Sequence, residues 1–279
     1  MNLGNELKIF KKNHLIKGKD VSGIRWEYIV AGKGKETILM IHGGVGSAES
    51  LFRYTTALEN DYRIITPTIP TEITTVKEVL AGVEDILNTE GASEVNLIGF
   101  SLGGMVEQIF LREHPENIKA LVLFHVPPPS KLYAKKIERI VKTNQNLPQW
   151  LPGILSSLYM KITFPREYPK VSKNDRNFWI DFYTRNTSKV RLVNQMTIVL
   201  DYLLNYDFKP DDLSSWRGKV LIFETTTDTM IPENEREQLK KIYPQAKVHT
   251  FSEGSHLGNG LFQVETTISL IRAFLAEGK

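Results

Sequence analysis

The fold of this chain is decided by the stretch Val95-Asn96-Leu97-Ile98-Gly99-Phe100-Ser101-Leu102-Gly103-Gly104-Met105. Its first half is an apolar run typical of a buried β-strand, and Ser101 stands two residues after that run ends at Gly99. A helical pattern with apolar residues at i, i+3, i+4, i+7 and i+8 follows at once, formed by Leu102, Met105, Val106, Ile109 and Phe110. Residues 99–103 therefore match the pattern G-x-S-x-G in a strand, turn and helix context.

The two glycines of this pattern have a steric reason. A turn this abrupt brings the strand and helix backbones close together, so side chains at positions 99 and 103 would collide. The turn leaves the hydroxyl of Ser101 projecting, with the positive end of the helix dipole beneath it. The helix is expected to stop at His114-Pro115, because a residue before proline avoids helical angles.

Composition bounds the class of protein. A chain of 279 residues with 41% hydrophobic content can bury a large core. There is no cysteine, so the chain has no disulfide, thiolate metal site or cysteine nucleophile. The net charge of +3 is too small to indicate nucleic-acid binding. Residues 1–6 lack the apolar run of a signal peptide, and no apolar stretch approaches the ~20 residues of a membrane helix. We therefore predict a cytoplasmic protein without an integral membrane segment.

Strand-like runs alternate with helical patterns on both sides of the central stretch, which implies right-handed crossovers and a parallel sheet with helices on both faces. Strands are expected at 37–41, 62–66, 95–99, 118–124, 219–223 and 246–251, and helices at 47–58, 74–90, 102–113, 233–242 and 260–276. Upstream, residues 7–31 predict two antiparallel strands around a turn at 17–20. The five lysines from Lys8 to Lys19 are interpreted as edge-strand and turn charges.

The alternation breaks at Pro127-Pro128-Pro129. No buried strand is evident from there to about Tyr206, and helical patterns appear near 131–142, 151–163, 175–185 and 188–206. We interpret 127–206 as a helical cap inserted at the end of one strand. Residues 1–126 and 207–279 then form the α/β core.

These features resemble the α/β-hydrolases, in particular their lidded esterases and peptidase-like members. The resemblance covers nearly all of residues 20–279 and is sharp in three core motifs. It implies a mostly parallel eight-stranded sheet flanked by helices, whose strand ends carry a Ser–acid–His triad in that chain order.

Three residues fit that order. Ser101 is the nucleophile, and the resemblance places the acid at Asp228, on a polar loop before a proline-initiated helix. Glu224 lies closer to the strand end and is the fallback. The base belongs on the loop after the last strand, which supplies His256. The 28 residues between acid and base leave room for one helix and one strand.

Each predicted role has a chemical reason. A serine hydroxyl needs a base within hydrogen-bond reach, and an imidazole with an ordinary pKa of about 6.5 can accept its proton and return it. Asp228 would hold the ring of His256 in the right tautomer. A tetrahedral oxyanion needs two donors, of which one is the backbone N–H of Leu102. By resemblance, the other is the N–H of Gly44, in the loop after His42-Gly43.

Plainer interpretations compete with these. Ser101 could mark a simple turn, and Asp228 a charge at a helix N-terminus. His42 is expected to fix its loop, and we interpret His14, His114, His125 and His249 as structural or surface residues. The alternative family position for the acid, after the 118–124 strand, offers His125 and no carboxylate before Glu138.

Cofactor and metal motifs are missing from the sequence. The stretch 44–49 fails the dinucleotide fingerprint at its last glycine, and no ribose-binding acid follows the next strand. The chain has neither a G-x-x-x-x-G-K-[ST] loop nor a His-Glu-x-x-His motif. We therefore predict a site without cofactor or metal.

The cap should set the substrate. It holds 13 lysines and arginines against 5 acidic residues, a net charge of +8. This favours an anionic substrate, an acidic partner or a membrane surface, although a solvated helical surface would look the same. One or two of its aromatic residues are expected to line an apolar acyl pocket, the candidates being Trp150, Tyr159, Phe164, Phe178, Trp179, Phe182 and Tyr183.

The sequence thus predicts a serine hydrolase that cleaves a carboxylic ester or related acyl bond of a small molecule through an acyl-enzyme. A C–C bond hydrolase or lyase could use the same triad, and so could a non-catalytic ligand-binding protein. The His-Gly-Gly-x-Gly run is similar to that of proline iminopeptidases, with Val45 in place of their proline. An aminopeptidase also needs carboxylates for the substrate ammonium, and this cap is poor in them.

Overall fold

The computed structural model describes residues 2–277 and has at its centre an eight-stranded sheet in the order β1-β2-β4-β3-β5-β6-β7-β8. Strand β2 pairs antiparallel with β1 and β4, and the remaining pairs are parallel. The predicted mostly parallel eight-stranded α/β fold is confirmed. The strands are β1 (Ile16–Val21), β2 (Ile24–Ala31), β3 (Thr37–Ile41), β4 (Arg63–Thr68), β5 (Val95–Phe100), β6 (Ile118–Phe124), β7 (Lys219–Thr225) and β8 (Lys247–Phe251).

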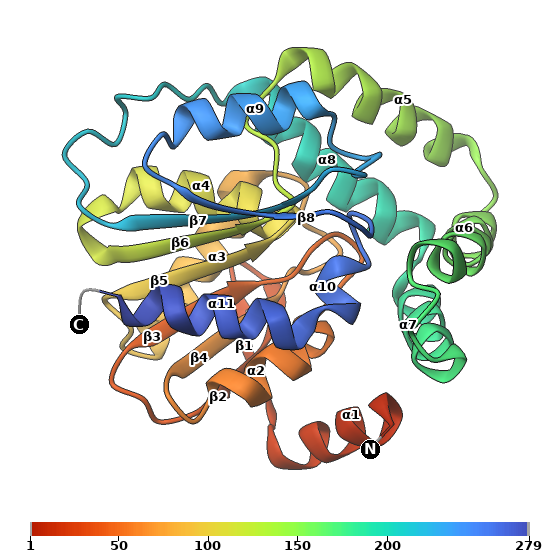
Figure 1. The fold of residues 1–279 in the computed structure, drawn as a ribbon, viewed down its shortest axis with the longest axis horizontal. Coiled ribbons are helices and arrows are strands. Elements are labelled where there is room, and N and C mark those ends of the chain that lie inside the picture. The colour runs from red at the N-terminus through yellow and green to blue at the C-terminus, as the bar shows by residue number, and fades with distance from the viewer. Residues whose placement is uncertain (1, 278–279) are drawn as a thin grey trace.

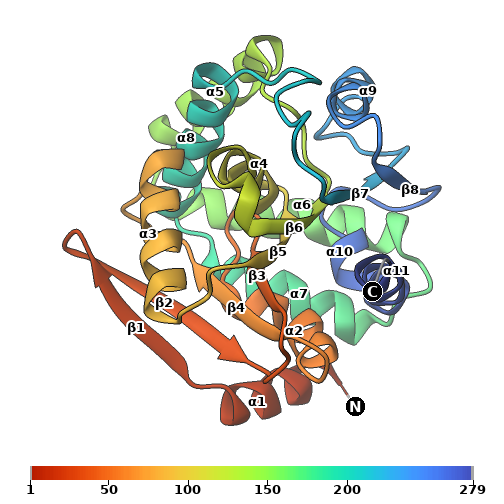
Figure 2. The same ribbon diagram turned by 90° about the vertical axis from the view of Figure 1, so that its left-hand side faces the viewer.

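Helices cover both faces of the sheet (Figures 1 and 2). One face packs on α3, α4 and α9, and the other on α2 and α11. The strands β3 and β5 to β7 are buried on both faces, which explains their continuous apolar sequences. The helix bounds are α2 (Phe52–Leu58, preceded by the 3₁₀ turn Ala48–Leu51), α3 (Val76–Thr89), α4 (Leu102–Glu113), α9 (Glu233–Ile242), α10 (Asn259–Phe262) and α11 (Val264–Ala276).

Four consecutive helices separate β6 from β7 and lie together beside one end of the sheet (Figure 1). This arrangement is the helical insert expected of a cap. Among residues 2–277, no helix is both long and apolar enough to cross a membrane. The inserted helices are α5 (Lys131–Asn146), α6 (Leu151–Glu167), α7 (Lys173–Asn186) and α8 (Lys189–Asn205).

The N-terminal prediction is wrong in its first half. Residues 3–13 form helix α1, whose Leu3 and Phe10 are buried among side chains of the core and the insert. The hairpin turns at Ser22-Gly23, where both residues have positive φ, rather than at 17–20. Three of the five lysines therefore lie on α1 and only the last two on edge strand β1. The burial of α1 depends on partners far along the chain, which its own sequence does not reveal.

Candidate active site

Ser101 occupies a strained turn between β5 and α4. Its φ of 48° and ψ of −111° lie outside the favoured regions for a residue with a side chain. The turn is held by a 2.8 Å hydrogen bond from its N–H to the carbonyl of Phe124. A Cβ on Gly103 would lie 2.2 Å from the carbonyl oxygen of Ile41, and one on Gly99 would lie 2.3 Å from Gly104 Cα. The steric reason for both glycines is thus the one inferred from the sequence.

The structure brings the three predicted triad residues together. Ser101 Oγ lies 2.9 Å from His256 Nε2, and His256 Nδ1 lies 2.9 Å from Asp228 Oδ2. They follow the carboxyl ends of β5, β7 and β8, which lie at the same end of the parallel part of the sheet. This network assigns the proton on His256 to Nδ1 and leaves Nε2 as the acceptor for the serine hydroxyl.

Asp228 is buried and accepts several hydrogen bonds. Its Oδ1 accepts from the backbone N–H groups of Met230 and Ile231 at 2.8 and 2.9 Å. Burial alone would favour the neutral acid, but the adjacent imidazole of His256, whose Nδ1–H donates to Oδ2, holds the pKa of Asp228 well below the ordinary range. The carboxyl group is therefore an ionised acceptor for the imidazole.

The fallback acid Glu224 makes other contacts. Its Oε1 accepts from Thr250 Oγ1 at 2.9 Å and from Lys240 Nζ at 3.2 Å. It therefore belongs to a polar cluster between β7, β8 and α9, and the carboxylate bonded to His256 is that of Asp228.

His125 is a neighbour of the triad that sequence reasoning set aside. It follows β6 with a φ of 49°, and its buried ring places Nδ1 3.4 Å from Asp228 Oδ2, beyond ordinary hydrogen-bond length. Neither ring nitrogen has a hydrogen-bond partner within residues 2–277. Burial lowers its pKa, so the ring is neutral. The sequence feature that could have indicated this contact is the position of His125 directly after β6, the strand beside β7.

The loop after β3 lies against the nucleophile, since a Cβ on Gly43 would be 3.5 Å from Ser101 Cβ. His42 supports this loop: its Nδ1–H donates to the carbonyl of Gly43 at 2.7 Å, and its Nε2 accepts from the N–H of Ile69 at 3.1 Å. Complete burial lowers the pKa of His42 to about 4, so it is neutral near pH 7. This agrees with the loop-fixing role expected for it.

Two side chains of α8 also hold the loop. The N–H of Val45, which has a φ of 53°, donates to Gln195 Oε1, and Arg191 Nη2 donates to the carbonyl of Gly46 at 2.7 Å. The N–H of Gly44 makes no hydrogen bond within the described part of the chain. The two predicted oxyanion donors lie on these elements, Gly44 on the loop after β3 and Leu102 at the start of α4.

An apolar cavity of about 350 Å³ lies beside these loops. Its wall includes Val45 and also Leu257, the residue after His256. The remaining lining comes from α5 to α8 and carries no charged side chain among the described residues, the members being Asn144, Pro152, Leu155, Ser156, Tyr159, Met160, Tyr183, Thr187 and Leu192. Neither this cavity nor a larger groove of about 650 Å³ between α1, α2 and α11 has a triad residue in its lining, but only the former is lined by neighbours of the candidate site.

Among residues 2–277, two residue groups have the donor atoms for a metal ion. One is His125 with Asp228 and His256, and the other is a more exposed set formed by Glu84, Glu113 and His114. In the first group, both nitrogens of His256 and both oxygens of Asp228 already take part in hydrogen bonds. The triad therefore accounts for that cluster, and the absence of a cofactor or metal stays a prediction.

Comparison with known proteins places the chain in a family. The family model for the alpha/beta hydrolase fold matches residues 36–261, so this protein belongs to that family. A hydrolase from Pseudomonas aeruginosa has the same fold, with a TM-score of 0.76 at 17% identity over 94% of this chain and 98% of that one. A thermophilic esterase from Thermogutta terrifontis gives 0.73 at 18% identity, over 93% and 97%.

Curated relatives match more locally. The chain is 34% identical over 104 residues to the uncharacterized hydrolase YcgS of Bacillus subtilis, covering 35% of this chain and 36% of that protein. It is 28% identical over 149 residues to a proline iminopeptidase of Lactobacillus acidophilus, covering 46% and 50%. The chain thus spans a third to a half of the length of these relatives.

Proposed function

We propose that this protein is a serine hydrolase that cleaves a carboxylic ester or related acyl bond of a small molecule. One observation carries the proposal: the unbroken chain of 2.9 Å contacts from Ser101 through His256 to Asp228. A serine in a sharp turn, a base within reach of its proton and an ionised acid behind that base are the parts needed for acyl transfer.

The proposed reaction has two halves. As Ser101 Oγ bonds to the acyl carbon, its proton passes to His256 Nε2, and the carbonyl oxygen becomes an oxyanion facing the N–H groups of Gly44 and Leu102. Collapse of this intermediate breaks the ester bond, and His256 gives its proton to the leaving alcohol. Water then attacks the acyl-enzyme by the same route, which releases the acid and restores the serine hydroxyl.

The cavity argues for an apolar acyl group. We propose that residues 127–206 act as a cap over the site and that this uncharged cavity, bordered by Val45 and Leu257, receives the acyl chain. A peptidase acting on a free amino terminus would need a carboxylate there, and none of the lining residues carries one. We therefore attribute the likeness to proline iminopeptidases to common ancestry and not to a shared substrate.

Labelling with a fluorophosphonate probe tests the proposal. Wild type and an exposed-serine control, Ser93→Ala, should be labelled equally, whereas Ser101→Ala should not be labelled. Hydrolysis of p-nitrophenyl esters of increasing chain length would then size the acyl pocket. An unlabelled wild type would contradict any serine-nucleophile mechanism and favour a non-catalytic binding protein. Labelling without ester turnover would favour C–C bond cleavage by the same residues.

A further inference from the structure

Helix α6 carries apolar side chains on two opposite sides. Its inward side buries Pro152, Met160 and Phe164. Its outer side, with the preceding residue, exposes six large apolar side chains within thirteen residues, each between 46% and 64% exposed. We call this set the α6 face; its members are Trp150, Ile154, Leu155, Leu158, Tyr159 and Ile162.

The α6 face is a continuous strip rather than a scatter. Trp150, Ile154, Leu158 and Ile162 follow one another at intervals of four residues, which places them along one side of the helix. A helix that is apolar all round is normally buried in a protein core or in lipid. Contiguous exposed apolar surface of this kind marks an interaction site, whereas single exposed apolar residues need no explanation.

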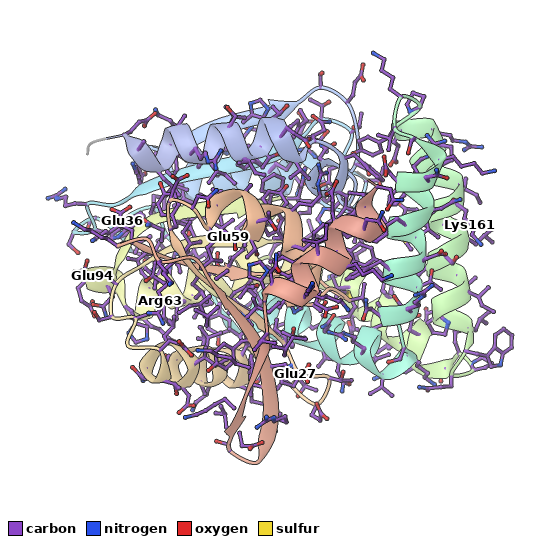
Figure 3. The ribbon with its side chains drawn as sticks, turned by 90° about the horizontal axis from the view of Figure 1, so that it is seen from below. Glu27, Glu36, Glu59, Arg63, Glu94 and Lys161 are labelled. Atoms are coloured by element: carbon purple, nitrogen blue, oxygen red, sulfur yellow. The ribbon has the colours of Figure 1, made fainter. Side chains whose placement is uncertain are left out.

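The charge around this strip selects the kind of partner. No acidic residue occurs between Glu138 and Glu167, a span that contains four basic residues: Arg139, Lys142, Lys161 and Arg166. All four are exposed, and only Lys142 forms an ion pair within the described residues, with Glu138 at 2.6 Å. Lys161 lies at the outer edge of the insert (Figure 3).

The same charge disfavours a second copy of this chain as the partner. A two-fold contact would set this segment, whose residues 139–166 are basic and contain no acidic side chain, against itself, because such interfaces use the same patch on both subunits. An anionic lipid surface, in contrast, attracts the basic residues while its acyl region accepts the apolar ones. Tryptophan and tyrosine are the aromatic residues favoured at the boundary between headgroups and acyl chains.

We propose that the α6 face docks this protein on an anionic lipid bilayer. The helix would lie in the plane of the interface, with its apolar strip among the upper acyl chains and its basic neighbours among the headgroups. Residues 127–206 hold a net charge of +8 in a chain of +3, so the rest of the molecule is net negative and is repelled. Charge therefore favours docking with the insert toward the lipid.

The docked orientation also identifies a source of substrate. Leu155 and Tyr159 belong both to the α6 face and to the wall of the cavity beside Val45 and Leu257. The apolar strip and the cavity are thus continuous, so an acyl chain could pass from the bilayer toward Ser101. This second step, an acyl ester taken from the membrane, rests on the proposed function; the docking itself does not.

Vesicle flotation of the full chain tests the docking. Wild type should bind vesicles of phosphatidylcholine mixed with phosphatidylglycerol at least about tenfold better than phosphatidylcholine alone, and high salt should weaken this binding. The combined substitution Ile154→Ser, Leu158→Ser, Ile162→Ser should reduce it by about tenfold or more. A control with three exposed apolar residues elsewhere, Leu15→Ser, Ile16→Ser and Val248→Ser, should bind as wild type.

Further variants separate the two steps. Tryptophan fluorescence should shift to the blue on binding in wild type, and Trp150→Phe should remove the shift. Ser101→Ala should bind vesicles like wild type, so docking is measured independently of catalysis. The triple serine variant of the α6 face should keep its unfolding temperature and its labelling by fluorophosphonate but lose hydrolysis of a long-chain ester embedded in vesicles.

Three outcomes would overturn the docking proposal. Wild type could fail to float with anionic vesicles, or the triple variant could float as well as the control. Analytical ultracentrifugation could instead show a wild-type dimer that the triple variant dissociates, without any vesicle binding, which would assign the α6 face to self-association. Vesicle binding that leaves long-chain ester hydrolysis unaffected by the triple variant would retain docking and remove the substrate step.

Discussion

Replacing Gln195 with alanine is expected to impair catalysis without touching any triad residue. Gln195 lies on α8, is completely buried, and accepts the hydrogen bond from the N–H of Val45. Its Nε2 has no partner within residues 2–277. The loop that it holds contains Gly44, one of the two proposed oxyanion donors.

The size of the effect follows from the loop geometry. Val45 is β-branched and has a φ of 53°, a conformation that costs about 1–2 kcal/mol for such a residue. Loss of the glutamine leaves the partly buried N–H of Val45 unpaired, at a further cost of up to about 1–3 kcal/mol. The loop should therefore relax, and the N–H of Gly44 should leave its position. Loss of one oxyanion donor lowers kcat by about 10² to 10³. Because Arg191 still binds the carbonyl of Gly46, we expect Gln195→Ala to lower kcat by about tenfold to a hundredfold.

The assay is steady-state hydrolysis of a short p-nitrophenyl ester, with kcat and KM determined separately. The control is Asn194→Ala, because Asn194 lies beside Gln195 on α8 and donates at 2.8 Å to the carbonyl of Thr71, in a different loop. This control should leave kcat within about twofold of wild type, since it breaks no contact to the oxyanion loop. In a Val45→Gly background the loop needs less support, so Gln195→Ala should reduce kcat several times less.

A kcat within about twofold of wild type for Gln195→Ala, in a variant that labels and unfolds normally, would refute this reasoning. An equal loss in the wild-type and Val45→Gly backgrounds would show that strain at this position is not what the glutamine opposes. A rise in KM at constant kcat would assign Gln195 to substrate binding instead.

Other expectations concern buried polar groups. Asp228→Asn should lower kcat for ester hydrolysis by about 10⁴-fold, because it reverses the tautomer of the His256 imidazole. His125→Phe should lower kcat by about tenfold or less in the same assay, since the 3.4 Å contact of His125 with Asp228 is long. The pKa of His42 is lowered from 6.5 to about 4, so the folded state disfavours its protonation. About 3 kcal/mol of stability, present above pH 6.5, should therefore be lost as the pH falls toward 4. Denaturant unfolding of His42→Gln should show a flatter dependence of stability on pH. Burial raises the pKa of Glu107 well above its ordinary value, so its contribution is present at acidic pH and declines as the pH rises; Glu107→Gln should therefore be more stable than wild type, by a margin that thermal unfolding shows to grow with pH.

Much of the fold could be predicted because its constraints are local. The glycines around Ser101 are required by close backbone approaches within one turn or to the neighbouring strand. Continuous apolar runs identify strands that are buried on both faces. The four inserted helices were predicted in order, because prolines and polar caps mark their ends. Helix α1 was mistaken for a strand since its apolar residues are few and are explained only by distant partners.

The site was predictable where the family order applies and hidden where contacts are long-range. Ser101, Asp228 and His256 each follow a recognisable strand, so their meeting was expected. His125 reaches Asp228 only because β6 and β7 are neighbours in the sheet. Gln195 and Arg191 contact a loop about 150 and 145 positions earlier, a pairing that no local pattern encodes.

The spacing of the triad along the chain has a consequence for refolding. Ser101 and His256 are 155 positions apart, and the base follows β8, the edge strand that is last in both chain order and sheet order. The proposed nucleophile therefore acquires its proposed base only when the C-terminal strand has joined the sheet. During renaturation, helical circular dichroism should recover first and reaction with a fluorophosphonate last, so that probe reports completion of the native topology.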